Sequence, residues 1–261
     1  MAQDQKMSYE LTEQQQSDFA RDGYLFLPGQ FTRQEVGTLM QAIDVLTALS
    51  PEACVGRQMV YFEDSVRNKG ERLLSRIEKF VEYQPTFGEL AADPRLLVPL
   101  RQLLQDEPCL FKDKVNFKAS GGQGFAPHQD IQPGWDDYAD YFVSALITID
   151  PSTVENGCLE LAAGIHTRGL IGERWKPLSG SQLENITFVP FPTQPGDVAL
   201  FDCFTPHQSA PNLTTRPRRN VYLTYNRASA GDHRLQYYAD KRKSFPPDYE
   251  REPGRTYQYR V

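Results

Sequence analysis

The sequence predicts a single, mainly β domain with an N-terminal helical layer and a double-stranded β-helix behind it. Residues 10–105 contain stretches with apolar side chains at spacings of three and four, which is typical of amphipathic helices. From Cys109 onward the chain consists of short extended segments separated by Gly, Pro and Asn, which indicates an all-β sandwich or barrel. No Ser- or Gly-rich linker separates the two parts. We therefore expect one domain over 1–261, with a helical layer at about 10–105 and a β core at about 109–230.

The first two elements have clear local signals. Thr12 followed by EQQQSDFARDG predicts a helix that begins at a capping threonine and ends at Gly23. The segment YLFL, residues 24–27, is short and apolar and predicts a strand. These signals place a helix and a strand before the main helical segment.

A second helix is predicted to begin at Thr32, because apolar residues then recur at helical spacing: Val36, Leu39, Met40, Ile43, Leu46 and Leu49. The segment VYFED near residue 60 predicts a strand. Residues 72–82 and 94–105 carry further helical patterns. In the C-terminal part we expect strands in LFKDKVNFK, APHQD, FVSALITID, GCLELAA, TFVPFP, DVALFDCF and RRNVYLTYNRA.

Composition excludes several classes of protein. The 39% apolar share, with 15 Phe and 13 Tyr, is ample for a core, and the net charge of −6 without a dominant basic stripe argues against a nucleic-acid partner. No apolar run approaches the roughly 20 residues of a membrane span, and the N-terminus lacks the apolar region of a secretory signal. The four cysteines are dispersed, without a CxxC pair. We expect a cytoplasmic monomer or homodimer with a small-molecule substrate, in a reducing compartment.

Three residues form a predicted metal site. His128 and Asp130 lie two positions apart in the segment PHQD, and His207 opens a later extended segment, HQSAPN. Side chains at i and i+2 of a strand point to the same face, so one strand can offer an imidazole and a carboxylate to one ion. Two His and one carboxylate on one face of a metal, with the other positions open, are typical of non-haem Fe(II) oxygenases. Taken singly, the histidines could be buried core residues and Asp130 a turn residue.

An arginine strengthens the metal-site interpretation. Arg218 follows His207 by eleven residues and opens the alternating segment RRNVYLTYN. A guanidinium at this point could pair bidentately with the far carboxylate of an acid that chelates the metal. Arg216 and Arg219 are rivals for this role. Because neighbouring strand residues face opposite sides, Arg219 should point away if Arg218 points inward.

Several ordered blocks of the chain resemble the phytanoyl-CoA dioxygenase family of Fe(II)/2-oxoglutarate oxygenases. They are LTEQQQSDFARDGYLFLPGQFTRQEV, the HQD segment, ENGCLELAAGIHTRG, and PGDVALFDCFTPHQSAPN followed by RPRRNVYLTYN, which together cover most of the length. The resemblance implies a jelly-roll, cupin-like fold, iron held by His128, Asp130 and His207, and 2-oxoglutarate held by Arg218. It also implies O2 as co-substrate and succinate and CO2 as co-products. Halogenating relatives lack the carboxylate ligand, so the intact Asp130 favours hydroxylation.

The C-terminal tail, YNRASAGDHRLQYYADKRKSFPPDYEREPGRTYQYRV, is similar to bacterial members of the family that hydroxylate small organophosphonates. The resemblance implies hydroxylation of a C–H bond of a small polar metabolite, with 2-aminoethylphosphonate or its N-methylated form as the best candidate. Two alternatives remain at this point. One is a hydroxylase of an amino acid, an acyl group or a secondary metabolite, and the other is a non-catalytic jelly-roll sensor.

Substrate contacts are predicted from alternation. Lys112, Lys114, Asn116 and Lys118 share one face of a probable strand, where they would suit an anionic group if that face points inward. Lys114 and Asn116 lie near the metal-binding segment in chain order and are the favoured contacts, although the face could equally point to solvent. Tyr141, in the aromatic and acidic segment PGWDDYADYF, could belong to a lid that binds an ammonium group, or to an ordinary packed loop.

Overall fold

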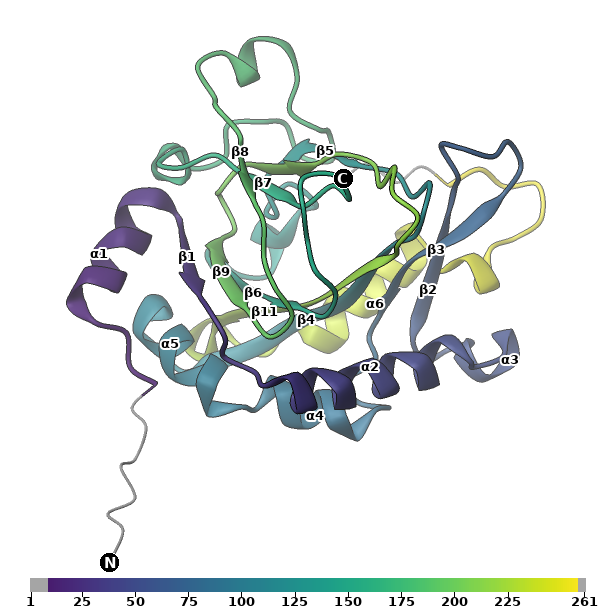
Figure 1. Cartoon of the computed structure of the whole chain (residues 1–261), viewed down its shortest axis with the longest axis horizontal. Coiled ribbons are helices and arrows are strands. Elements are labelled where there is room, and N and C mark those ends of the chain that lie inside the picture. Colours follow the sequence, from purple (N-terminus) through teal and green to yellow (C-terminus); the bar gives the residue numbers. More distant parts are fainter. Residues whose placement is uncertain (1–8, 258–261) are drawn as a thin grey trace, which may run out of the picture.

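The structure, a computed structural model, describes residues 9–257 and folds them into two facing antiparallel sheets with helices outside (Figure 1). The larger sheet has the strand order β1-β9-β6-β11-β4-β3-β2, and the smaller has the order β5-β10-β7-β8. This arrangement confirms the predicted double-stranded β-helix. The strands are β1 (Tyr24–Leu27), β2 (Met59–Asp64), β3 (Arg72–Glu78), β4 (Pro108–Lys118), β5 (Phe125–His128), β6 (Phe142–Thr148), β7 (Leu159–Leu161), β8 (Val189–Phe191), β9 (Val198–Asp202), β10 (His207–Ser209) and β11 (Arg218–Arg227).

The two helices predicted first are confirmed with their caps. Thr12 and Thr32 each accept a hydrogen bond from the backbone N–H three residues on and complete a capping box. The first helix ends at Gly23, whose φ of 82° lies in the left-handed region that glycine tolerates. The helices are α1 (Glu13–Asp22), α2 (Arg33–Thr47), α3 (Pro51–Cys54), α4 (Pro85–Ala91), α5 (Pro94–Leu104) and α6 (Arg234–Ser244), with short 3-10 turns at Trp135–Asp137, His166–Arg168, Gly180–Leu183, Ala228–Ala230 and Asp248–Glu250.

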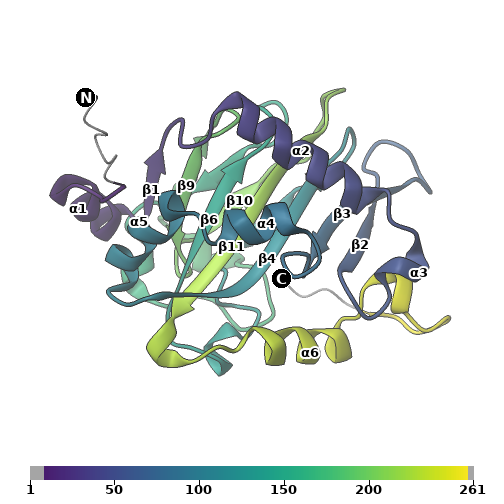
Figure 2. The same ribbon diagram turned by 90° about the horizontal axis from the view of Figure 1, so that it is seen from below.

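Helices α2, α4 and α5 cover the outer face of the larger sheet (Figure 2). The apolar residues that α2 was predicted to bury pack with outward-facing residues of the central strands in one core. This core includes Val36, Leu39, Ile43, Leu96, Leu100, Val115, Val143, Ile147, Leu200, Val221 and Leu223. The outer face of the sheet therefore supplies most of the hydrophobic burial, and the inner face is left for other residues.

The helical prediction for residues 72–82 is wrong. Residues 72–78 form strand β3, which pairs with β2 on one side and β4 on the other. The apolar residues of RLLSRIE fit a short helix and a strand equally well, and a run of this length cannot be decided by periodicity. Pairing with two neighbouring strands decides it. The predictions of a strand near residue 60 and of a helix over 94–105 are confirmed by β2 and α5.

The register of the strands aligns polar side chains in rows on the inner face of the larger sheet. Arg76, Asn116 and Asn220 are paired across β3, β4 and β11, and Lys114 is paired with Glu78 on one side and Tyr222 on the other. In the smaller sheet, His128 and His207 are directly paired across β5 and β10. The two sheets therefore bring charged residues of one to the histidines of the other. Among residues 9–257, no helix has both the length and the apolar character of a membrane span.

Candidate active site

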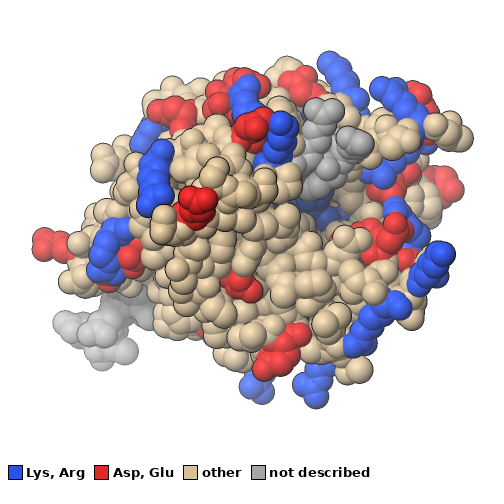
Figure 3. All heavy atoms as spheres, turned by 90° about the horizontal axis from the view of Figure 1, so that it is seen from above, with Lys and Arg blue, Asp and Glu red and all other residues tan. Residues whose placement is uncertain are grey.

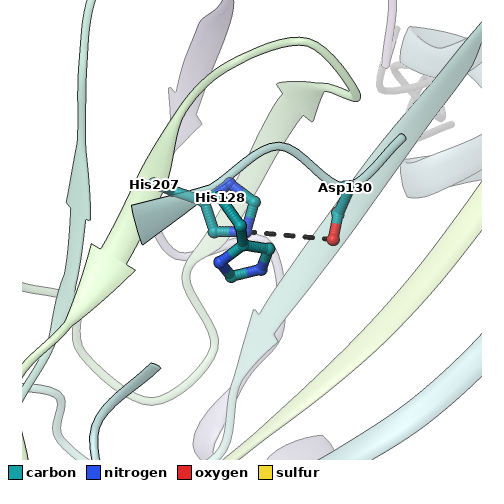
Figure 4. A group of neighbouring side chains, drawn as sticks. All are labelled: His128, Asp130 and His207. Carbon is teal, nitrogen blue, oxygen red and sulfur yellow. Dashed lines mark ion pairs between the residues drawn. The ribbon is translucent and has the colours of Figure 1, made fainter. Parts of the chain in front are cut away.

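The structure brings the three predicted metal ligands together. One candidate ligand atom from each of His128, Asp130 and His207 lies within 4.8 Å of the others. The two imidazole rings have centroids 4.2 Å apart, and His207 Nε2 lies 3.8 Å from Asp130 Oδ1 (Figure 4). These distances are wider than direct hydrogen bonds and leave room for one ion between the three groups.

Hydrogen bonds orient all three side chains. His128 Nδ1 donates to the Ala126 carbonyl at 2.7 Å and His207 Nδ1 donates to the Thr205 carbonyl at 3.0 Å, so both rings present Nε2. The Ser144 hydroxyl donates to Asp130 Oδ2 at 3.1 Å, which leaves Oδ1 toward the histidines. Fixing the tautomer and the ring angle in this way is how partners of metal ligands raise affinity.

The protonation states of the three residues also suit a cation. Burial lowers the pKa of His128 to about 3 and also lowers that of His207, so both imidazoles are neutral at pH 7. Burial by itself would raise the pKa of Asp130, but nearby positive charge, chiefly the ammonium of Lys114, holds it low, at about 2. Two neutral imidazoles and one carboxylate are the deprotonated forms that a divalent metal binds.

Arg218 lies in the cavity with this triad, and its guanidinium is buried without a carboxylate partner in the described part of the chain. It donates to the Gly157 carbonyl at 3.0 Å and, with the Asn220 amide oriented to accept, to that amide oxygen at 2.6 Å. Its Nε has no partner within residues 9–257. A buried guanidinium with an unused donor fits the carboxylate of 2-oxoglutarate.

The rival arginines lie elsewhere. Arg219 pairs with Asp150 at 2.7 Å, on the side of the strand away from the cavity, and Arg216 is exposed. The structure therefore places Arg218, the residue favoured by strand alternation, in the cavity.

Four cations and one carboxylate line the cavity that contains the triad. Lys114 and Asn116 are both in its wall, so the lysine-rich face of β4 points inward and not to solvent. The lining residues are Arg76, Lys112, Lys114, Asn116, Phe125, His128, Asp130, Pro133, Leu159, His207, Gln208, Ser209, Arg218 and Tyr222. Lys114 Nζ lies 4.6 Å from the centre of the Tyr222 ring and has no ion pair within the described residues.

Three cations share a single buried carboxylate beside the cavity. Glu78, which is fully buried, lies 2.8 Å from Arg76 Nε, 3.7 Å from Lys112 Nζ and 2.5 Å from Lys241 Nζ. Burial alone would raise the pKa of Glu78, but the three cations together lower it. This cluster, which we call the Glu78 cluster, retains an excess of positive charge that faces the cavity through Arg76 and Lys112.

Two wider clefts adjoin the inner cavity. One of about 800 Å³ shares Arg76, Phe125 and His128 with it and is lined by aromatic rings and Glu63. The other, of about 720 Å³, shares Lys112 and Pro133 with it. Trp175 lines both clefts, and its backbone N–H donates to the Gln132 carbonyl at 2.9 Å. One face of the molecule is visibly hollowed, with basic side chains inside the hollow (Figure 3).

Tyr141 is the one predicted site residue that the structure places outside the cavity and both clefts. Its ring packs under the Arg227 guanidinium at 5.0 Å, and its hydroxyl hydrogen-bonds Asp202. The acidic residues that precede it also have partners, since Asp136 and Asp137 both pair with Arg174. The lid interpretation of this segment is therefore wrong for Tyr141, because local packing satisfies its ring and hydroxyl.

Sequence reasoning missed two residues of the Glu78 cluster that matter for the cavity. Arg76 was hidden by the helical prediction for 72–82. Lys241 lies in α6, in a KRK segment that resembles an ordinary solvated surface. Alternation did include Lys112 on the inward face of β4. Only the Arg-x-Glu spacing of Arg76 and Glu78 in a strand would have pointed to the cluster.

Comparisons with known proteins agree with this geometry. The family model described as phytanoyl-CoA dioxygenase (PhyH) matches residues 19–220. The chain is 34% identical to a 2-aminoethylphosphonate dioxygenase from uncultured bacterium HF130_AEPn_1, over 96% of this chain and 95% of that protein. It is 32% identical to a methylphosphonate hydroxylase of Gimesia maris, over 92% and 90%. EctD from S. alaskensis, solved with 2-oxoglutarate and 5-hydroxyectoine, superposes with a TM-score of 0.71 at 29% identity, over 84% and 77%.

The jelly roll, the triad and these relatives define an Fe(II)- and 2-oxoglutarate-dependent dioxygenase that acts on a small molecule. The chain belongs to the phytanoyl-CoA dioxygenase family.

Proposed function

We propose that this dioxygenase hydroxylates a C–H bond of a small organophosphonate, with 2-aminoethylphosphonate or its N-methylated form as the best candidate. His128, Asp130 and His207 would hold Fe(II), and Arg218 would bind the far carboxylate of 2-oxoglutarate. The observation that carries the substrate assignment is the excess of positive charge in the cavity, where four cations face one carboxylate.

The bound iron, with 2-oxoglutarate and O2, supplies the oxidant and yields succinate and CO2 with the hydroxylated product. The chain supplies geometry and charge. Ser144 and the two backbone carbonyls fix the three ligands, and Arg218 fixes the orientation of the co-substrate. Asp130 and His207 are buried, His207 at 5% exposure, and His128 is half-buried, so water has restricted access to the reacting atoms.

Charge balance favours a phosphonate over an uncharged substrate. Arg218 and the metal would be balanced largely by the co-substrate's two carboxylates and Asp130, which leaves the ammonium groups of Lys112 and Lys114 to attract the substrate. Glu78 offsets only part of this charge because Lys241 also binds it. A doubly charged, three-oxygen group can accept hydrogen bonds from several of these donors at once. Lys114 and Asn116 would therefore contact the phosphonate, together with Arg76 and Lys112.

The amino group of the substrate has a candidate partner in Glu63. This carboxylate lines the wider cleft that shares Arg76 with the inner cavity, and it accepts hydrogen bonds from the Ser75 hydroxyl and the Gln123 N–H, both at 2.9 Å. None of the described cations forms an ion pair with it, and burial raises its pKa. A partly buried carboxylate whose direct hydrogen-bond donors are neutral would gain from an ammonium ligand.

The test has two stages, of which only the first is anaerobic. Fe(II) and 2-oxoglutarate are added to the apo-protein, and the weak visible charge-transfer band of the chelate is expected. Aminophosphonates, alkylphosphonates, amino acids and short acyl-CoA esters are then screened for O2-dependent succinate formation. Phosphonates should give turnover, and Asp130→Ala should remove it.

Two outcomes would contradict the proposal at different levels. A chelate band with inert phosphonates would retain the dioxygenase and reject the substrate. If none of the candidate substrates gives succinate, and the iron-loaded protein shows no chelate band, the non-catalytic sensor is favoured.

We further propose that the protein is cytoplasmic, which is supported by its four cysteines without disulfides. We also propose that it is a monomer or homodimer, and light scattering of the purified protein would measure the oligomeric state.

A further inference from the structure

Lys118 lies behind the cavity wall, not in the wall with the other lysines of β4. Its side chain is 2% exposed, and it is directly paired in the sheet with Arg218. Its ammonium donates to the Ala210 carbonyl at 2.6 Å, the Ser209 hydroxyl at 2.7 Å and the Gly157 carbonyl at 3.2 Å. All three acceptors are neutral, and no carboxylate among residues 9–257 forms an ion pair with it.

Lys118 and Arg218 are tied together through one backbone carbonyl. The Gly157 oxygen accepts from Lys118 Nζ and also from Arg218 at 3.0 Å. Gly157 has a φ of 72°, and a Cβ at this position would lie 2.0 Å from the Ala210 oxygen and 3.1 Å from Lys118 Nζ. The turn therefore requires glycine, and it brings two buried positive charges close together without a negative charge between them.

Lys118 also determines where the Ser209 hydroxyl points. Ser209 Oγ accepts from Lys118 and, at 3.4 Å, from the Phe125 N–H. With its lone pairs used in this way, the hydroxyl hydrogen is left to donate in another direction. Because Ser209 lines the cavity with Arg218, this donor would face the same ligand as the guanidinium.

The charge of Lys118 is poorly compensated in the ligand-free protein. Burial, followed by the charge of Arg218, lowers the pKa of Lys118 to about 7. The opposing groups that face it are Glu63 from β2, Glu160 from β7 and Cys158 from the turn before β7, and their combined effect is smaller. Arg218 stays charged at all relevant pH values, so Lys118 is the group of this pair that can change its charge.

We propose that Lys118 is a positioning residue of the 2-oxoglutarate site, and that it takes up a proton when the co-substrate carboxylate binds Arg218. This inference rests on the proposed role of Arg218. A carboxylate beside the two cations supplies the missing negative charge, so it favours the ammonium form of Lys118. The proton comes from solvent and forms the third N–H bond of the ammonium group, while no covalent bond of the co-substrate changes.

The sign of the pH effect follows directly. Below pH 7 Lys118 is already protonated in the free protein, so the binding of 2-oxoglutarate takes up few protons. Between pH 7 and the higher pKa of the complex, binding requires a proton from solvent. The affinity for 2-oxoglutarate should therefore fall with rising pH, by up to about tenfold per pH unit.

Anaerobic titration calorimetry of the Fe(II)-loaded protein with 2-oxoglutarate tests the inference. The binding heat is measured in Hepes and in Tris, whose ionisation enthalpies differ, and the difference gives the protons taken up. For a pKa of about 7 that rises on binding, we expect about 0.9 proton at pH 8 and about 0.1 at pH 6. This measurement on the unmodified protein needs neither turnover nor a phosphonate.

Variants assign the proton to Lys118. Lys118→Met should abolish the uptake at pH 8, weaken 2-oxoglutarate binding and make the affinity nearly independent of pH from 7 to 9. Lys118→Gln, which keeps a donor to the two carbonyls, is a second variant if the first folds poorly. Lys243→Met is the matched control, because Lys243 is an exposed lysine on α6 with an 80% exposed side chain.

Each outcome has a distinct meaning. Binding of 2-oxoglutarate by the unmodified protein without buffer-dependent heat at pH 8 would overturn the inference. Full proton uptake in Lys118→Met or Lys118→Gln would also overturn it, because another group would then be responsible. If the iron-loaded protein does not bind 2-oxoglutarate at either pH, the proposed function itself is wrong, and the two failures are distinguishable.

Discussion

The space between the two sheets has a charged half and an apolar half. Where β3, β4 and β11 line the cavity, four side chains are basic and carboxylate partners are few. Where β6 and β9 face β7, the same inner surface carries an apolar cluster formed by Leu146, Leu159, Leu161, Ala199, Phe201 and Tyr222. The strand geometry is the same in both halves, so the difference arises from side chains alone.

The comparison shows which half is complete without ligands. Apolar side chains gain their stability from contact with one another, and the cluster around Leu146 needs nothing further. Buried cations gain stability only from paired anions, and the buried Arg218 and Lys118 and the half-buried Lys114 form no ion pair within residues 9–257. The charged half therefore contains positive charge without a counter-charge, which the metal-bound co-substrate and an anionic substrate would neutralise.

The largest expected effect comes from removing the one carboxylate of the Glu78 cluster. Glu78→Gln removes the carboxylate that the buried side chains of Arg76, Lys112 and Lys241 share, so we expect a loss of about 3–5 kcal/mol in the free energy of unfolding. Urea titration measures this loss. Added sulfate or methylphosphonate should restore part of it, because an anion that binds only the folded state stabilises that state.

The matched change in the apolar half is Leu146→Ala. It should cost about 2–5 kcal/mol through a cavity, and sulfate should restore nothing beyond its general effect on the unmodified protein. Equal recovery of both variants in sulfate would show that the two halves do not differ in the way proposed.

A smaller effect is expected at the support of the metal site. Ser144→Ala removes the hydrogen bond to Asp130 Oδ2 and leaves that carboxylate less fixed. Fe(II) affinity, measured by anaerobic titration, should fall about 10- to 100-fold. Thr148→Val is the control, since Thr148 is a buried hydroxyl on the same strand that bonds Thr193 and not a metal ligand. A comparable loss in both variants would assign the effect to β6 packing.

The smallest expected effect concerns the amino end of the substrate. Glu63→Gln keeps one acceptor oxygen for the Gln123 N–H and places its amide NH2 toward the Ser75 hydroxyl, whose oxygen can accept. It removes the negative charge, so the KM for 2-aminoethylphosphonate should rise about tenfold, with little change for methylphosphonate. As the pH falls, Glu63 becomes protonated and the preference for the aminated substrate should disappear. Because the pKa of Glu63 is raised, this loss should occur at a higher pH than it would for an ordinary glutamate. Glu71→Gln, at an exposed glutamate between β2 and β3, is the control. Equal changes for both substrates would remove Glu63 from amine recognition.

Much of the site was predictable because its signals are local. The two-residue spacing of His128 and Asp130 pointed to a shared ion, although β5 ends at His128 and Asp130 lies in the turn that follows it. The parity of Arg218 and Arg219 follows from strand geometry and needs only a short segment. The same holds for the helices capped by Thr12 and Thr32. In contrast, Tyr141 was misplaced, because whether an aromatic ring faces a ligand or packs on Arg227 depends on a segment far along the chain.

By itself, then, the sequence indicated the family and the jelly roll through a resemblance, and the metal triad through the spacing of His128, Asp130 and His207. Alternation grouped the lysines of β4 on one face but left open whether that face points inward. Only the tertiary structure decided that residues 72–78 are a strand, that Arg76, Lys112 and Lys241 share Glu78, and that Lys118 lies behind the wall beside Arg218. The physical reason is that strand pairing and charge compensation are long-range. A short apolar run becomes a strand when two neighbours accept its hydrogen bonds, and a lysine's charge depends on which anions the fold brings within reach.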